Sequence, residues 1–84
     1  MSAGPSIADF VKERNEMLLS GDIDRALAFW EKWSPEFKPS SRLVAEAAMH
    51  KARTADASLP IEARRESKQW LTAHRLESFD DGDL

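Results

Sequence analysis

Helix-breaking residues are few in this chain, and they are confined to a small number of points. Only three glycines and four prolines occur among 84 residues. Those inside the chain are Gly21, Pro35, Pro39 and Pro60. Because glycine and proline are the residues least compatible with a helix interior, the stretches between these points are free to be helical. The sequence therefore predicts an all-α fold.

The first two stretches are predicted to form a helical hairpin. Ser6 is placed to cap the first helix, Gly21 to end it, and Asp22 to cap the second helix almost at once. Since only two residues join them, the two helices are expected to run antiparallel. The apolar faces at helical spacing are Ile7, Phe10, Val11, Met17 and Leu18 on the first helix, and Ile23, Ala26, Leu27, Phe29, Trp30 and Trp33 on the second.

This hairpin resembles a single tetratricopeptide repeat. In residues 20–32, a Gly-Asp turn precedes an Ala-Leu pair and then the aromatic residues Phe29 and Trp30, and Pro35 lies near the closing proline of that family. The resemblance covers residues 6–35 and implies a helical hairpin packed in that style. The first helix lacks the early tryptophan and the Leu-Gly pair of the family, and residues 36–84 show no second copy. Because repeat arrays need about three units, no peptide-binding groove is carried over from the family.

The second half of the chain is predicted to form another hairpin. A connector rich in proline and serine spans residues 34–41, a third helix spans residues 42–55, and a fourth opens at Leu59-Pro60. The predicted core faces are Val44, Ala47, Ala48, Ala52 and Ala55 on the third helix, and Ala63, Ser67, Trp70, Leu71 and His74 on the fourth. Residues 1–76 are thus expected to be a single domain, a bundle of four helices arranged as two hairpins, and residues 77–84 a flexible acidic tail.

Charge is unevenly distributed along the chain. The net charge is −3 overall, with −2 in residues 1–40, +3 in residues 41–76 and −4 in residues 77–84. In the fourth helix, Arg64, Lys68 and Arg75 fall within about 40° of arc, at 100° per residue, and form a basic stripe. The stripe has two interpretations: an ordinary solvated face, or a surface that meets phosphates or an acidic protein.

Two further features suggest contact surfaces rather than catalytic sites. The breadth of the apolar face of the second helix indicates that Phe29 and Trp33 are partly uncovered and belong to an interface, with core packing as the alternative. Arg14 and Lys51 interrupt apolar arcs. We expect them either to pair with acidic neighbours at the edge of the core or to mark a face that meets a partner.

The histidines do not assemble a reaction centre. His50 and Glu46 lie one turn apart, but one such pair is too few ligands for a metal, and a solvated helix face is the simpler interpretation. His74 follows Trp70 by one turn and is expected to stack on it. Cysteine is absent, which excludes disulfides, thiolate zinc sites and cysteine nucleophiles. We predict no catalytic residue, metal or cofactor.

The bulk properties suggest a cytoplasmic protein without a membrane segment. No apolar run approaches the roughly 20 residues that a spanning helix needs. Residues 1–5 have neither the basic region nor the apolar stretch of a signal peptide. The function predicted from these features is that of a small non-enzymatic helical module that binds another protein or itself. The alternative is a small nucleic-acid-binding regulator that uses the basic stripe, with the acidic tail as an internal competitor.

Overall fold

The computed structural model describes residues 6–84 and contains four α-helices and no strand in that range. The helices are α1 (Ile7–Ser20), α2 (Ile23–Trp33), α3 (Arg42–Ala55) and α4 (Ile61–Ala73). The all-α prediction is thereby confirmed. Residues 1–5, for which the sequence argued against a signal peptide, lie outside the described range.

Local capping sets the boundaries of the first hairpin. The hydroxyl of Ser6 accepts a hydrogen bond from the Asp9 amide at 3.1 Å, and the carboxylate of Asp22 accepts one from the Asp24 amide at 2.9 Å. Between the helices, Gly21 has a φ of 64°, the left-handed conformation that glycine adopts at least cost. The predicted caps and the predicted turn are all present.

The second half of the chain uses different boundary signals. Ser41 caps α3 by accepting a hydrogen bond from the Val44 amide at 3.1 Å, and Pro60 directly precedes α4. At the other end of α4, Arg75 takes the left-handed conformation with a φ of 59°. There the Leu76 amide donates to the Leu71 carbonyl at 2.8 Å, which is a Schellman ending.

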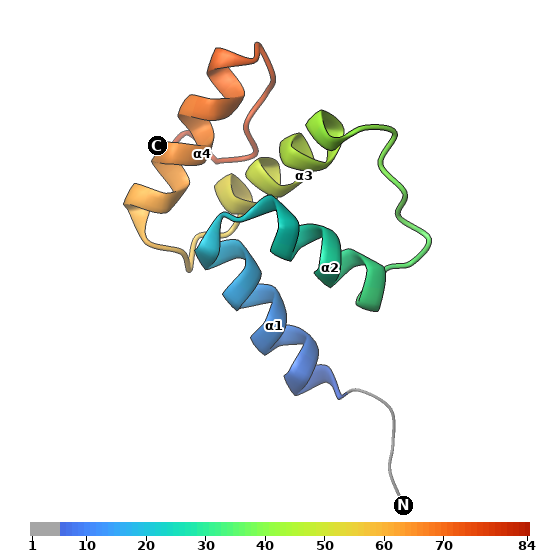
Figure 1. Cartoon of the computed structure of the whole chain (residues 1–84). Helices are drawn as coiled ribbons and strands as arrows, with labels where there is room; N and C mark the ends of the chain where they lie inside the picture. The colour runs from blue at the N-terminus through green and yellow to red at the C-terminus, as the bar shows by residue number, and fades with distance from the viewer. Residues whose placement is uncertain (1–5) are drawn as a thin grey trace, which may run out of the picture.

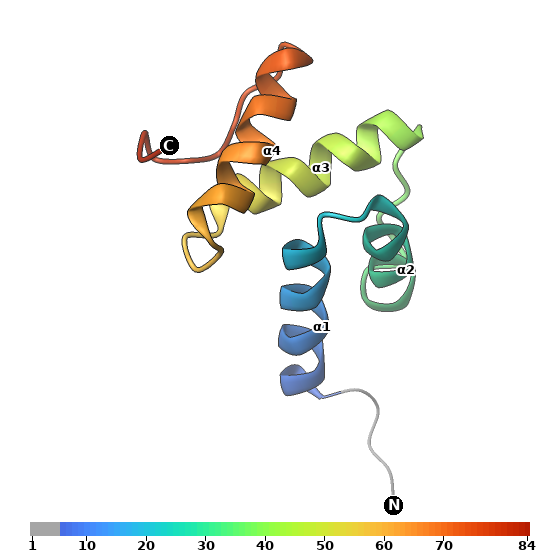
Figure 2. The same ribbon diagram turned by 60° about the vertical axis from the view of Figure 1, so that its left-hand side comes forward.

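The helix α3 is the element that joins the parts of the fold. It contacts all three other helices, while α1 and α2 contact each other along the first hairpin. Figures 1 and 2 show α3 crossing near the end of that hairpin where the chain turns from α1 into α2, with α4 packed on α3. The two hairpins are thus linked mainly through α3.

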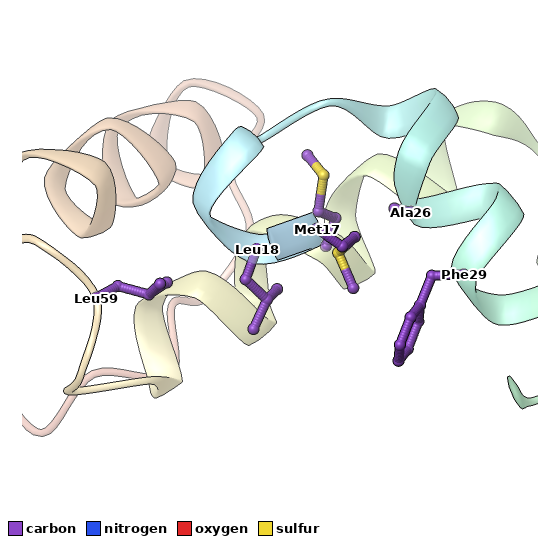
Figure 3. Close-up of a cluster of buried hydrophobic side chains, with 6 residues drawn as sticks. Met17, Leu18, Ala26, Phe29 and Leu59 are labelled. Atoms are coloured by element: carbon purple, nitrogen blue, oxygen red, sulfur yellow. The ribbon is translucent and has the colours of Figure 1, made fainter. Parts of the chain in front are cut away.

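A small hydrophobic core lies where α1, α2, α3 and the α3–α4 loop meet (Figure 3). Leu18 and Ala26 are fully buried, and Leu59 reaches the cluster from the loop. The cluster consists of Met17, Leu18, Ala26, Phe29, Met49 and Leu59. On α1, the buried members lie in the C-terminal half, and Phe10 of the N-terminal half packs against them. Ile7 and Val11, predicted to lie on the core face, are 83% and 46% exposed.

The predicted core face of α3 is wrong at Val44 and Ala55, whereas Ala52 does pack against the core. Val44 is 44% exposed and Ala55 is also exposed, whereas the buried residues of α3 are Ala45, Met49, His50, Arg53 and Thr54. The physical reason is that α3 is covered by the first hairpin on one side and by α4 on another. The side next to α4 is filled by polar residues whose partners lie on α4, and hydrophobicity alone does not reveal such a face.

Candidate interaction sites

Two of the three residues of the predicted basic stripe, Arg64 and Lys68, are not freely solvated. The side chain of Arg64 is only 7% exposed. Its Nη1 donates to a carboxylate oxygen of Asp83 at 2.6 Å, and its Nη2 donates to the carbonyl of Thr54 at 2.7 Å. Arg64 therefore ties α4 to α3 and to the C-terminal residues. Its Nε is a buried nitrogen with no hydrogen-bond partner among residues 6–84.

Lys68, one turn after Arg64, is also engaged by the C-terminal residues. Its Nζ lies 3.1 Å from Oδ2 of Asp80, whose side chain is 3% exposed. A hydrogen bond from the Ser78 hydroxyl, followed by those from Lys68 and the Gly82 amide, lowers the pKa of Asp80 to about 2, although burial acts in the opposite direction. Asp80 is therefore a firmly ionised partner for Lys68 at neutral pH.

Arg75 does not join the other two basic residues. It follows the last turn of α4 in the left-handed conformation and is exposed. Within the described part of the chain it forms no ion pair. The structure thus places Arg64 and Lys68 together and separates Arg75 from them, because the helical spacing that aligned the three residues ends before position 75.

The C-terminal tail, residues 77–84, folds back against α3 and α4 (Figure 2). The Phe79 amide donates to the Thr54 hydroxyl at 2.9 Å, and Nζ of Lys51 lies 5.4 Å from the centre of the Phe79 ring. The expectation of an undocked, solvated tail is therefore corrected. Its acidity is matched by the positive charge of the preceding segment, and Arg64 in particular needs an anion because its charge is buried.

An open cleft of about 500 Å³ lies between α4 and the end of the tail. Leu84 forms one wall of the cleft. Lys68, which pairs with Asp80, also lines it. The cleft is lined by Arg65, Lys68, Gln69, Thr72, Ala73 and Leu84. The tail therefore leaves part of the surface beside α4 uncovered.

The predicted interface residues of α2 are packed inside the first hairpin. Phe29 is 8% exposed, with its ring centre 5.5 Å from that of Phe10. The indole of Trp33 packs edge-on to Phe10 at 5.4 Å, and its Nε1 donates to Glu13 at 3.3 Å. Phe29 and Trp33 therefore pack within the hairpin, as in the alternative interpretation, and they do not form a free aromatic surface.

A buried polar cluster at the α3–α4 interface was missed by the sequence analysis. Arg53 is 3% exposed, and its Nε donates to the Leu18 carbonyl at 2.8 Å. Its Nη1 donates to the Ser67 hydroxyl and to the Glu66 carboxylate, both at 3.0 Å. The Ser67 hydroxyl also lies 2.8 Å from Nδ1 of His50. Since Ser67 is fully buried, this pair of hydroxyl and imidazole holds the interface together and offers no open nucleophile.

Both histidines stack on Trp70. His50 lies 4.4 Å and His74 3.9 Å from the Trp70 ring centre, both with nearly parallel planes. The predicted stacking of His74 on Trp70 is confirmed, whereas the solvated position expected for His50 is wrong. Burial, followed by the charge of Arg53, lowers the pKa of His50. The burial of His50 could be predicted only together with its partner Ser67, which the sequence places on the core face of the fourth helix.

The charged residues that interrupt the apolar arcs both find partners. Arg14 pairs with Asp56 in the α3–α4 loop at 3.4 Å, and Lys51 faces the Phe79 ring. In the described range, no three side chains of the histidine, aspartate and glutamate types gather as a metal site would require. Nor does that range contain a helix with the length and apolar character needed to cross a membrane.

Comparison of the chain with protein-family models, curated proteins and solved structures gives no match.

Proposed function

We propose that this chain is a small non-enzymatic protein-interaction module, and that its contact surface is the uncovered apolar stripe of α1. The stripe consists of Ile7 and Val11, which are one turn apart. With Arg14 and Leu18 they fall on one face of the helix. Leu18 is buried in the core and Arg14 pairs with Asp56, whereas Ile7 and Val11 remain exposed.

The single observation that carries this proposal is the exposure of Ile7 and Val11, at 83% and 46%. An isolated exposed apolar side chain needs no explanation, but here two of them extend a core stripe beyond the end of the bundle. Such a stripe is buried most simply by a second helix. Another copy of the chain is the first candidate, because a two-fold contact between equal stripes is self-complementary.

Sedimentation equilibrium of the full chain over a range of concentrations tests the proposal. We expect the average mass to rise with concentration, and a Val11→Lys substitution to abolish the rise. Leu43→Lys is the matched control, since Leu43 is similarly exposed at 52% but lies on α3. If the chain stays monomeric, an affinity capture that depends on Val11 supports a heterologous partner. If Val11→Lys changes neither mass nor capture, the proposal fails.

Nucleic-acid binding through the basic stripe remains the alternative function, but no structural observation favours it. Arg64 and Lys68 are engaged by Asp83 and Asp80, and they become available only if the C-terminal tail moves. A mobility-shift assay at low salt distinguishes the two functions, because phosphate contacts weaken steeply as salt is raised. The cytoplasmic location is also part of the proposal and rests on the absence of cysteine.

A further inference from the structure

Arg64 is a buried cation that requires an anion at one defined place. Its Nη2 is bound by the Thr54 carbonyl, which fixes the orientation of the guanidinium, and its Nη1 points to the carboxylate of Asp83. A buried charge that loses its partner is destabilising. The surface of α4 is therefore built to hold a carboxylate at this position, whichever segment supplies it.

A second contact on the same surface sets the spacing of the carboxylates. Lys68 lies one helical turn from Arg64 and holds Asp80, while Arg64 holds Asp83. Two cations four residues apart on one helix thus pair with two carboxylates three residues apart in a non-helical segment that turns at Gly82, where the Gly82 amide donates to Asp80. The recognition element is an acidic sequence with that spacing.

A third contact distinguishes a polypeptide from other anions. The hydroxyl of Thr54 donates its hydrogen to the Lys51 carbonyl at 2.8 Å, so towards the tail it acts as an acceptor. It accepts a hydrogen bond from the main-chain N–H of Phe79 at 2.9 Å. A peptide backbone supplies such a donor, whereas the phosphate backbone of a nucleic acid does not. The position of Lys51 over the Phe79 ring further favours an aromatic residue just before the acidic pair.

The tail fills this surface incompletely. Phe79 remains 55% exposed, and the side chain of Asp83 is 47% exposed. The cleft of about 500 Å³ beside Leu84 stays open. Docking of the tail therefore buries little apolar area and depends on two ion pairs, each with one buried and one partly exposed member.

We propose that the surface formed by Arg64, Lys68, Thr54 and Lys51 is a binding site for a short acidic segment of a partner protein. The C-terminal tail occupies this site as an intramolecular ligand. The partner segment carries an aromatic residue followed by two carboxylates at the spacing of Asp80 and Asp83. It competes with the tail, so binding of the partner and release of the tail are one event. This site is separate from the α1 stripe and does not depend on it.

Binding of a labelled peptide to the full chain tests the proposal. The probe has the sequence of residues 76–84 with a fluorophore at its N-terminus, and the protein carries Asp80→Asn and Asp83→Asn to weaken its own tail. By fluorescence anisotropy, we expect the double variant to bind the probe at least about tenfold more tightly than the parent chain, because the tethered tail competes at high effective concentration in the parent.

Three controls define the site. Adding Lys68→Gln to the double variant should weaken binding several-fold, while adding Lys12→Gln, a lysine of α1, should leave it unchanged. A probe with asparagine in place of the aspartates that correspond to Asp80 and Asp83 should not bind. Val11→Lys should not alter probe binding, so failure here and failure of the α1 proposal can be told apart.

The proposal is overturned if the probe binds neither protein, if it binds both equally, or if Lys68→Gln has no effect. It is also overturned if a short single-stranded oligonucleotide binds more tightly than the peptide in a Lys68-dependent manner, since the site would then select phosphates. If the double variant loses its helical circular dichroism, the parent chain is titrated with excess unlabelled peptide and followed by NMR. The Phe79 amide resonance must then shift as its bond to Thr54 is lost, and an unchanged resonance contradicts the proposal.

Discussion

Arg53 lies directly against Gly21, so that a Cβ atom added to the glycine would be 2.8 Å from Nη1 of the arginine. The same guanidinium group donates to the Leu18 carbonyl at the end of α1 and to the Ser67 hydroxyl on α4. One side chain of α3 therefore binds the turn of the first hairpin and the last helix at once. We expect these parts of the fold to unfold together rather than independently.

Replacing Gly21 with alanine should destabilise the protein by about 2 kcal/mol or more. The left-handed conformation alone costs a residue with a side chain about 1–2 kcal/mol, and the new methyl group must also displace Arg53. Urea denaturation of the two proteins measures the difference. Gly82→Ala is the matched control, because Gly82 has a φ of 85° but nothing lies within 4 Å of its added Cβ. Equal losses for the two variants would show that Arg53 does not press against the turn.

Removing the guanidinium group of Arg53 should be more damaging than removing the charge of its acidic partner. Arg53→Met leaves the Leu18 carbonyl and the Ser67 hydroxyl without their donor, for an expected loss of roughly 3–5 kcal/mol. Glu66 is 71% exposed, so Glu66→Gln should cost less than about 1 kcal/mol. Both values come from chemical denaturation. A comparable loss for the two variants would mean that the ion pair, rather than the buried hydrogen bonds, carries the stability.

The boundaries of the helices were predictable because they depend on local interactions. Ser6, Asp22 and Ser41 each bond an amide two or three residues ahead, and Gly21 adopts the conformation that favours glycine. These interactions are complete within a few residues of sequence. The first hairpin follows from them, since a two-residue link leaves its helices little choice but to run antiparallel.

The buried polar residues were not predictable, because their partners lie far away in the sequence. Arg53 is buried only because Leu18 and Ser67 offer it acceptors, and Arg64 only because Asp83 returns to meet it. A periodicity analysis assigns such residues to the solvent side. It therefore misplaced the core face of α3 and interpreted the acidic C-terminal tail as solvated.

On α1, hydrophobic periodicity predicts more burial than the structure shows. Ile7 and Val11 have the right spacing for the core, but among residues 6–84 no other helix buries them. Hydrophobic periodicity identifies the face of a helix that can be buried, whereas the length of the neighbouring elements decides how much of that face is buried. The uncovered part became the candidate interface.

The stability of the protein should fall as the pH is lowered through the range below 6.5. Burial and the nearby charge of Arg53 lower the pKa of His50 from 6.5 in the folded protein, while Glu46 and Glu66 oppose the shift. Below pH 6.5 the unfolded chain therefore binds a proton at His50 more readily than the folded chain does, and unfolding is favoured. Above pH 6.5 the histidine is neutral in both states and this loss is absent.

Thermal melts between pH 7.5 and about 5 measure this effect. His50→Gln should flatten the dependence of the melting temperature on pH in that range. His74→Gln is the matched control, because His74 also stacks on Trp70 but is exposed. If His50→Gln retains the full dependence of the parent, another group is responsible.

Truncation of apolar side chains along α1 should have opposite consequences at its two ends. Leu18 is fully buried, so Leu18→Ala should cost about 2–5 kcal/mol from lost burial and the remaining cavity. Ile7→Ala should change stability by less than about 0.5 kcal/mol, because the side chain is 83% exposed and alanine is the better helix former. The measurement is urea denaturation at a protein concentration low enough to exclude association. A large loss at Ile7 would mean that the face of α1 that carries Ile7 is covered after all.

Replacing Arg75 with glycine should stabilise the protein, although the same chemical change is unfavourable elsewhere on the chain. Arg75 ends α4 with a φ of 59°, a conformation that a glycine adopts without steric penalty. After allowing for the greater freedom of glycine in the unfolded chain, we expect a gain of about 0.5 kcal/mol. Arg65→Gly is the control, since Arg65 is an exposed residue inside α4, where glycine costs about 1 kcal/mol relative to a good helix former. Opposite shifts in the urea midpoint would establish that Arg75 adopts the left-handed conformation just after α4. A loss of stability in both variants would instead place Arg75 inside the helix, on the same face as Arg64 and Lys68.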